Sequence, residues 1–432
     1  MLFKNIGIVD ENFDYVKSMF VETKDDRIVY VSSVRPENYE GEEYDGTGKV
    51  LMPGFVNAHS HSPMTLLRGY AENLPLQRWL NEKVFPFEDR IKGEDAYYSS
   101  MLAIAEMLRY GTVSFSDMYF FSENVAKAVT DSDIKCNFSR AITSFEDTDI
   151  ENLQSFRESE DIVKRFHNAA DGRLKIDMSL HAEYTNRRTI IEQFAEKVRE
   201  RGLRAHIHLS ETKKEHEECK AKYSLTPTQL FYKCGVFDVP TIAAHCVWVE
   251  DGDIELLREK GVTAATCPAS NLKLGSGICD VYKLLKSGVN VAIGTDSVAS
   301  NNNLNMIKEM FLCALLPKGL HNDASVVSER DILKMATVNG YKAQGREDSG
   351  AIKAGCKADL CVLNIESEHM YPQTDMINNL VYAADGADVV LTMADGRVLY
   401  KDGEFTTIDI EKVKSTVNAA ASRIISEVKK NG

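Results

Sequence analysis

The sequence predicts an α/β protein built on a (β/α)8 TIM barrel, with a small β-sandwich domain formed by the two ends of the chain. The first observation concerns the centre of the chain, where eight short β-rich runs alternate with helical stretches between Lys49 and Gly355. Eight such strands in one chain favour a closed parallel barrel. The second observation is that both ends carry alternating polar and apolar runs, which are typical of a β-meander.

The predicted barrel strands are KVLMPGFVNAH, TVSFSDM, KCNFSRAI, KIDMSLHAEY, RAHIHLS, TIAAHCVWV, TAATCPAS and VNVAIGTDS. Local helix signals follow these runs. The segment from Thr226 to Gln229 combines a capping box with proline at the first helical position, and Gly235 then acts as a stop. Ser122 begins a helix after the second strand. We therefore expect the barrel domain to cover residues 53–357.

The two ends are expected to form the second domain, over residues 1–52 and 358–432. Runs such as DRIVYVSSV near the start and DVVLTMADGRVLYKDGEF near the end alternate in hydrophobicity and contain turn residues. The segment IEKVKSTVNAAASRIISEVKK predicts a helix at the end of this domain.

Composition excludes several kinds of partner. The net charge of −14 disfavours nucleic acid and anionic membranes, because both require clustered Lys and Arg. No run approaches the roughly 20 apolar residues of a membrane helix. The nine cysteines include no C-x-x-C pair, which predicts reduced core thiols rather than disulfides or a thiolate zinc site. We expect a cytoplasmic protein that acts on a small, neutral or weakly charged molecule.

A His-x-His pair ends the first predicted strand. Because His59 and His61 are two residues apart, both side chains leave the same face of the strand and can converge on one ion. The pair is a weak indication of a metal by itself, since the same spacing also occurs on surfaces and in cores.

Polar residues also end other predicted strands: His208 the fifth, His245 the sixth and Asp296 the eighth. Catalytic groups of TIM barrels gather at this C-terminal rim. His206 precedes His208 by two residues, so one of the two can be a core histidine; His208 is the better ligand because it lies at the rim. Asp296 can alternatively cap a helix.

These motifs resemble the amidohydrolase superfamily, and within it the methylthioadenosine/S-adenosylhomocysteine deaminase branch. The resemblance covers nearly the whole chain and rests on PGFVNAHSHSPMTLLRGYAENLPLQRWL, HLSET, IAAHCVWV, PASNLKLGSG and GTDSVASNNNLNM. It implies a barrel with a split β-domain, in agreement with the pattern above. It also implies hydrolytic deamination of an adenine nucleoside: 5′-methylthioadenosine, S-adenosylhomocysteine, adenosine or 5′-deoxyadenosine.

The resemblance implies metal ligands at His59, His61, His208 and Asp296. Three imidazoles and one carboxylate suit Zn²⁺, although Fe²⁺ and Mn²⁺ accept the same donors. Relatives with two metals need a carboxylated lysine at the end of the fourth strand. That strand ends in His181 here, so we expect one divalent ion.

The resemblance also implies catalytic roles. Asp296 takes a proton from the attacking water, Glu211 protonates the ring nitrogen beside the reacting carbon, and His245 orients the hydroxide or the developing charge. The alternative for Glu211 is a solvated carboxylate near the charged helix TKKEHEECK. The H-x-E…P-C-x-x-C pattern of cytidine-type deaminases is absent from the sequence. We therefore expect deamination at a TIM-barrel site and not at a cytidine-deaminase-type zinc site.

For the substrate, the resemblance implies contacts from Trp79, Glu88, Arg140, His181 and Glu211. Trp79 would form an aromatic wall, Glu88 would bind ribose hydroxyls, and Arg140 would meet the carboxylate of S-adenosylhomocysteine. The structural alternatives are helix packing for Trp79, ion pairs for Glu88 and Arg140, and a strand-end hydrogen bond for His181. FEDTDIENLQSF offers no second arginine for that carboxylate, which weakens the homocysteine interpretation.

Two other functions remain open at this stage. One is an aminohydrolase of a different heterocycle, such as guanine, a pterin or a triazine, for which a ribose-binding Glu88 would have no use. The other is a barrel that has lost catalysis and works through oligomer contacts, which the full set of proposed ligands argues against. A homo-oligomer is expected from the family resemblance.

Overall fold

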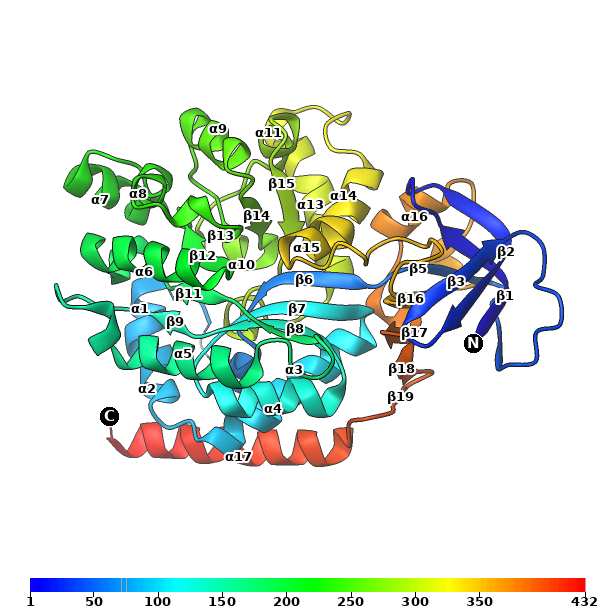
Figure 1. The fold of residues 1–432 in the computed structure, drawn as a ribbon, viewed down its shortest axis with the longest axis horizontal. Helices are drawn as coiled ribbons and strands as arrows, with labels where there is room; N and C mark the ends of the chain where they lie inside the picture. Colours follow the sequence, from blue (N-terminus) through cyan, green and yellow to red (C-terminus); the bar gives the residue numbers. More distant parts are fainter. Residues whose placement is uncertain (71, 75, 432) are drawn as a thin grey trace.

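A parallel barrel forms the centre of the computed structural model, which describes residues 1–70, 72–74 and 76–431 (Figure 1). Each predicted run contributes one barrel strand, which confirms the predicted fold. The strands are β6 (Phe55–Ser60), β7 (Thr112–Met118), β8 (Lys135–Ser139), β10 and β11 (Leu174–Ile176 and Met178–Leu180, two halves of the fourth strand), β12 (Ala205–Leu209), β13 (Thr241–His245), β14 (Thr263–Thr266) and β15 (Asn290–Ile293).

Strand pairing closes the barrel in two places. On one side, β10 pairs with β8, whereas β11 pairs with β12 and with β9 (Ala141–Ile142), which continues β8. On the other side, Ser60 bridges to Asp296, and the Asp296 amide donates to the His59 carbonyl at 2.9 Å. Gly294 permits this approach, because a Cβ there would lie 2.8 Å from the His59 amide nitrogen. The closure therefore places His59 beside Asp296.

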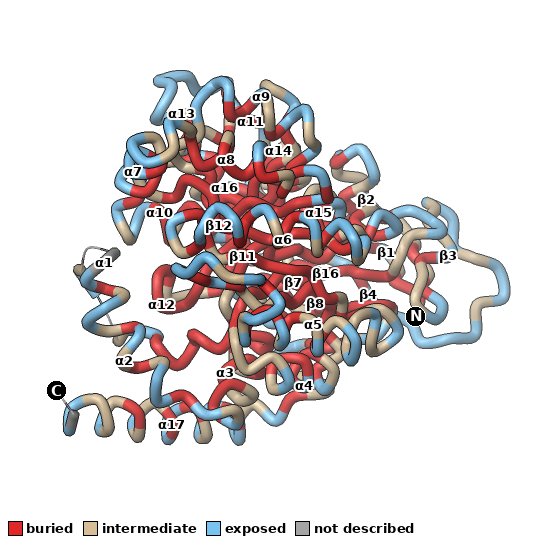
Figure 2. Tube along the Cα trace, turned by 60° about the vertical axis from the view of Figure 1, so that its left-hand side comes forward, coloured by how far each residue is buried: buried red, intermediate tan, exposed pale blue. Residues whose placement is uncertain are grey.

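Helices follow the strands and surround the buried barrel, as the exposed outer turns in Figure 2 show. The longer ones are α3 (Gly93–Arg109), α4 (Ser122–Ser132), α5 (Gln154–Phe166), α6 (Arg188–Arg201), α7 (Lys213–Tyr223), α9 (Asp251–Glu259), α13 (Met306–His321) and α14 (Glu329–Ala336). Shorter ones are α1 (Leu76–Trp79), α2 (Phe85–Glu88), α8 (Pro227–Lys233), α10 (Pro268–Lys273), α11 (Val281–Lys286), α12 (Val298–Asn301), α15 (Val338–Ala343) and α16 (Met376–Tyr382).

The predicted cap of α8 is present. The Thr226 hydroxyl accepts from the Gln229 amide at 3.1 Å, and the Gln229 side chain accepts in return from the Thr226 amide at 3.2 Å. Gly235 follows the helix with a φ of 82°, a conformation that glycine adopts without strain. The helix after the second strand likewise begins at Ser122.

The two ends of the chain form one nine-stranded sheet beside the barrel (Figure 1). Its strands are β1 (Leu2–Val9), β2 (Tyr15–Lys24), β3 (Arg27–Ser32), β4 (Glu43–Asp45), β5 (Lys49–Pro53), β16 (Leu360–Asn364), β17 (Val389–Ala394), β18 (Arg397–Lys401) and β19 (Glu404–Phe405). Antiparallel pairing of β5 with β16, in the register Leu51 to Val362, joins the two halves. The first predicted run is thus divided between β5 in this sheet and β6 in the barrel.

A buried ion cluster ties the sheet to the barrel. Lys135, at the start of β8, lies 2.5 Å from an oxygen of Asp359 and 2.7 Å from an oxygen of Asp395. Ser349 also donates to Asp359 at 2.8 Å. The lysine side chain is only 3% exposed, so its charge depends on these two carboxylates for compensation.

The predicted terminal helix is α17 (Ile410–Asn431), which runs along α3 at the edge of the barrel (Figure 1). Its residues Val413, Val417, Ala420 and Ile424 are buried. Their spacing of three and four residues puts them on one helical face, which explains the packing. None of the described helices combines the length and apolar character needed to cross a membrane.

Candidate active site

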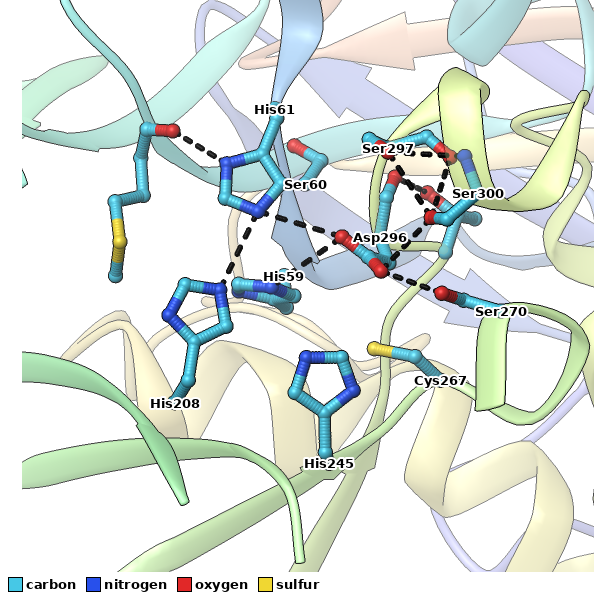
Figure 3. Close-up of polar contacts among 12 residues, drawn as sticks. His59, Ser60, His61, His208, His245, Cys267, Ser270, Asp296, Ser297 and Ser300 are labelled. Carbon is cyan, nitrogen blue, oxygen red and sulfur yellow. Dashed lines mark hydrogen bonds and ion pairs between the residues drawn. The ribbon is translucent and has the colours of Figure 1, made fainter. Parts of the chain in front are cut away.

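Four histidines and one aspartate from the ends of four strands meet at the C-terminal rim of the barrel (Figure 3). His59 lies in β6 and His61 just beyond it, His208 lies in β12, His245 ends β13, and Asp296 follows β15. The structure therefore brings together the residues that the sequence places at the barrel rim.

Two of the histidines are oriented by backbone carbonyls. His61 Nδ1 lies 2.5 Å from the carbonyl of Met118, and His208 Nδ1 lies 2.7 Å from the carbonyl of His181. A carbonyl only accepts, so each Nδ1 carries a proton, and in the neutral form of each ring Nε2 presents the lone pair. The two Nε2 atoms lie 3.4 Å apart. Metal-binding histidines typically donate their second ring nitrogen in this way.

His59 is oriented by another histidine. Its Nδ1 lies 2.9 Å from Nε2 of His206, and both rings are fully buried. His59 Nε2 is buried and has no hydrogen-bond partner among the described residues. Burial lowers the pKa of both rings, to about 3 for His206, and so keeps them neutral. A neutral, buried, unpartnered nitrogen is the expected state of a ligand atom that faces a cation.

Asp296 is held with one oxygen toward the histidines. The hydroxyls of Ser270 and Ser300 donate to Oδ2 at 2.5 and 2.9 Å. Oδ1 lies 3.3 Å from His61 Nε2 and 3.7 Å from His59 Nε2. Burial disfavours a charge on His61, but the hydrogen bond and charge of Asp296 raise its pKa to about 9. This corner of the site therefore favours a positive charge.

The donor set fits a divalent cation. Ligands bound tetrahedrally to Zn²⁺ at about 2.1 Å lie about 3.4 Å from one another. The separations found among His59, His61, His208 and Asp296 include 3.3, 3.4 and 3.7 Å. In the neutral rings the lone pairs of His61 and His208 face each other at 3.4 Å, an arrangement that a cation between them stabilises.

Glu211 and His245 lie next to this cluster. Asn271 Oδ1 accepts from His245 Nδ1 at 2.9 Å, which leaves Nε2 facing inward. That Nε2 is 3.9 Å from Glu211 Oε2, and Ser276 donates to Glu211 Oε1 at 3.0 Å. Both residues are buried, at 1% and 9% exposure. Glu211 thus has one oxygen fixed and the other turned toward His245.

A cavity of about 670 Å³ opens over these groups. Its walls include every residue predicted for metal, catalysis or substrate except His59, which is fully buried. The predicted lining residues are His61, Trp79, Glu88, Arg140, His181, His208, Glu211, His245 and Asp296. Trp79 also packs in the hydrophobic core that contains α3. This side chain therefore contributes both to core packing and to the wall of the cavity.

Glu88 and Arg140 both have partners. The Tyr119 hydroxyl donates to Glu88 Oε1 at 2.5 Å, and burial raises the pKa of Glu88 to about 7. Arg140 forms an ion pair with Glu158, with 2.7 Å between Nε and Oε2. The ion pair considered as an alternative for Arg140 therefore exists, although the residue still lines the cavity.

The residues that orient the predicted site residues are visible only in the structure. Ser270 and Ser300 lie within PASNLKLGSG and GTDSVASNN, so the motifs contained a signal for them. Tyr119 follows β7 with no local pattern that indicates its contact to Glu88, 31 residues earlier. His206 was considered as a ligand, and the structure instead places it against His59.

Fold and site together define the class of metal-dependent hydrolases built on the TIM barrel, whose polar groups converge at the C-terminal ends of the strands. The chain belongs to the amidohydrolase family, which it matches over residues 50–399.

Comparison with known proteins identifies similar chains that carry more specific names. A protein of Dictyoglomus thermophilum named 5-methylthioadenosine/S-adenosylhomocysteine deaminase is 44% identical over 383 residues, 89% of each chain. A 5′-deoxyadenosine deaminase of Methanothermobacter thermautotrophicus is 40% identical over 401 residues, 93% of each chain. The crystal structure of an adenosine deaminase from Xanthomonas campestris with bound zinc superimposes with a TM-score of 0.92 at 29% identity, covering 98% of each chain.

Proposed function

We propose that this chain is a metal-dependent hydrolytic deaminase, which converts an adenine nucleoside and water into the inosine analogue and ammonia. The observation that carries the proposal is one cavity that His61, His208, Asp296, Glu211 and Glu88 all line. The names of the three similar proteins described above, which are deaminases of adenosine or of its derivatives, support it.

The residues that would hold the metal are His59, His61, His208 and Asp296. Three neutral imidazoles and one carboxylate suit Zn²⁺, and Fe²⁺ or Mn²⁺ would accept the same donors. When bound, a divalent ion here supplies Lewis acidity that lowers the pKa of water and stabilises negative charge.

The attacking water loses its proton to Asp296. Two serine hydroxyls bind Oδ2 of this carboxylate and hold it beside the histidines. His245 Nε2, kept inward by Asn271, accepts a hydrogen bond from the nucleophile and so holds it toward the ring.

Glu211 supplies the proton that the purine ring needs. Protonation of the ring nitrogen beside C6 makes this carbon electrophilic, and the oxygen of water then adds to it. The proton that Asp296 has taken from the water passes to the amino group, the C6–N bond breaks and ammonia leaves. The C6 hydroxyl returns its proton to Glu211 as the ring carbonyl forms. Ser276 binds Oε1 of Glu211, which leaves Oε2 as the oxygen that carries the proton.

Glu88 would bind the ribose hydroxyls. Tyr119 occupies one of its oxygens, and the carboxylate can accept hydrogen bonds from the two hydroxyls of a ribose. This residue favours a nucleoside over the second candidate class, a free heterocyclic base or a triazine, which has no diol to bind.

The test is a substrate panel. Purified protein is assayed with adenosine, 5′-methylthioadenosine, 5′-deoxyadenosine, S-adenosylhomocysteine and guanine, with ammonia and ultraviolet absorbance measured together. Stoichiometric ammonia from at least one adenine nucleoside, lost on chelation and restored by Zn²⁺, is the expected result. Ammonia from guanine alone, or from none of the compounds, would overturn the proposal.

A further inference from the structure

Arg140 lies in the cavity wall with its charge already compensated. Its Nε donates to Glu158 Oε2 at 2.7 Å, and its Nη1 donates to the Ala141 carbonyl at 2.6 Å. The other carboxylate oxygen of Glu158 accepts from the Gln154 side chain at 3.1 Å. Ser159, which also lies in α5, donates its hydroxyl to the Arg140 carbonyl at 3.0 Å. This hydrogen bond attaches α5 to the backbone of Arg140. The pair is therefore held in place from both sides.

Besides the metal-binding end and Arg140, the described residues that line the cavity offer no Lys or Arg to an anion. Arg140 is the only arginine or lysine among the described residues that line the cavity. The acidic lining residues are Glu88, Asp89, Glu211 and Asp296. A ligand carboxylate that approaches the remaining N–H groups of Arg140 would also meet the negative charge of Glu158, in an acidic environment.

Aromatic side chains line the same cavity and remain exposed. Phe145 is 68% exposed, Phe85 is 47% exposed and Tyr184 is 38% exposed, and all three belong to the cavity wall. Phe145 lies five residues after Arg140 in the chain. Exposed aromatic groups around a pocket gain from covering an apolar ligand group.

We propose that Glu158 is a specificity-determining residue, which neutralises Arg140 and directs the enzyme toward nucleosides with an uncharged, apolar 5′ substituent. A 5′-thioether ending in methyl fits this environment, whereas a thioether ending in an amino-acid carboxylate does not. The inference rests on the proposed deamination of adenine nucleosides, and it adds the class of 5′ group to it.

The test compares two substrates that share the 5′ sulfur and differ in the amino-acid tail: 5′-methylthioadenosine and S-adenosylhomocysteine. For the unmodified protein, kcat/KM is expected to be at least about tenfold higher for the first. In Glu158→Gln, which keeps the shape of the side chain but removes its charge, kcat/KM for S-adenosylhomocysteine should rise about tenfold relative to 5′-methylthioadenosine. The double variant Arg140→Gln/Glu158→Gln should lose this gain.

Glu151→Gln is the matched control. Glu151 forms an ion pair of the same length with Lys197, 2.7 Å, and does not line the cavity. Glu151→Gln removes the same charge as Glu158→Gln, so the ratio of kcat/KM between the two substrates should remain that of the unmodified protein. The inference would be overturned if the unmodified protein turned over S-adenosylhomocysteine as well as or better than 5′-methylthioadenosine. An unchanged ratio of kcat/KM for these two substrates in folded Glu158→Gln would overturn it as well. Absence of ammonia from every nucleoside would instead refute the proposed function.

Discussion

Removal of the Tyr119 hydroxyl should change the pH at which the enzyme binds its nucleoside. Burial raises the pKa of Glu88 to about 7, and the hydrogen bond from Tyr119 keeps it from rising further. Above its pKa the Glu88 carboxylate accepts hydrogen bonds from ribose hydroxyls, so KM should fall as pH rises through about 7. A hydrogen bond to a charged group contributes about 1.5–3 kcal/mol. At about 1.4 kcal/mol per pKa unit, Tyr119→Phe should raise this midpoint by about one to two pH units.

The assay is KM and kcat for 5′-deoxyadenosine measured across pH for the unmodified protein and Tyr119→Phe. The ring that stacks on Phe120, with centroids 4.2 Å apart, is retained in the variant, so packing should survive. Tyr97→Phe is the control, because Tyr97 donates to Asp131 at 2.7 Å on the surface, outside the cavity. A KM midpoint that does not move in Tyr119→Phe, or that moves equally in Tyr97→Phe, would refute the reasoning.

Further variants test catalysis and stability. Glu211→Gln should lower kcat by about 10²–10⁴-fold while metal content by elemental analysis stays intact, since it removes a proton donor but no ligand; normal turnover would exclude its acid–base role. Lys135→Met leaves the buried Asp359 without its cation, whereas Asp395 keeps Lys357 at 3.5 Å, so urea unfolding should show a loss of about 3–5 kcal/mol; a loss below about 1 kcal/mol would contradict the buried-cluster argument. Burial, followed by the charge of Glu215, raises the pKa of Glu183 well above its usual range, and burial raises that of Glu215 to about 7. Acids with a raised folded-state pKa stabilise the fold below their unfolded pKa, and this stability is lost as pH rises through the folded value. Glu183→Gln should therefore flatten the fall in Tm between about pH 5 and 8. Parallel curves of Tm against pH for the unmodified protein and the variant would contradict the effect assigned to Glu183 and Glu215.

Local sequence patterns were sufficient to predict the architecture. Strand and helix signals such as the Thr226 cap act within a few residues, so their order along the chain predicted the barrel strands and the terminal helix. The positions of His59, His61, His208 and Asp296 at strand ends also follow from this order, because parallel strands of a barrel all end at one rim. Their metal-binding roles stay predictions.

The orientation of each side chain at the rim was beyond the sequence. The Met118 carbonyl that turns His61 and the His206 ring that turns His59 lie 57 and 147 residues away from their partners. Such contacts depend on how neighbouring strands are staggered and on which rotamers the packed interior allows, and neither is encoded in a local pattern.

The sequence by itself determined the type of fold, the two-part organisation and the set of polar residues at the barrel rim, since these depend on periodicity and short-range capping. Only the tertiary structure decided how those residues are used. Barrel closure at Gly294 puts Asp296 against His59, and α5 brings Glu158 onto Arg140 in the cavity wall. Both contacts form between elements whose separation in space is fixed only when the barrel has closed and its helices have packed.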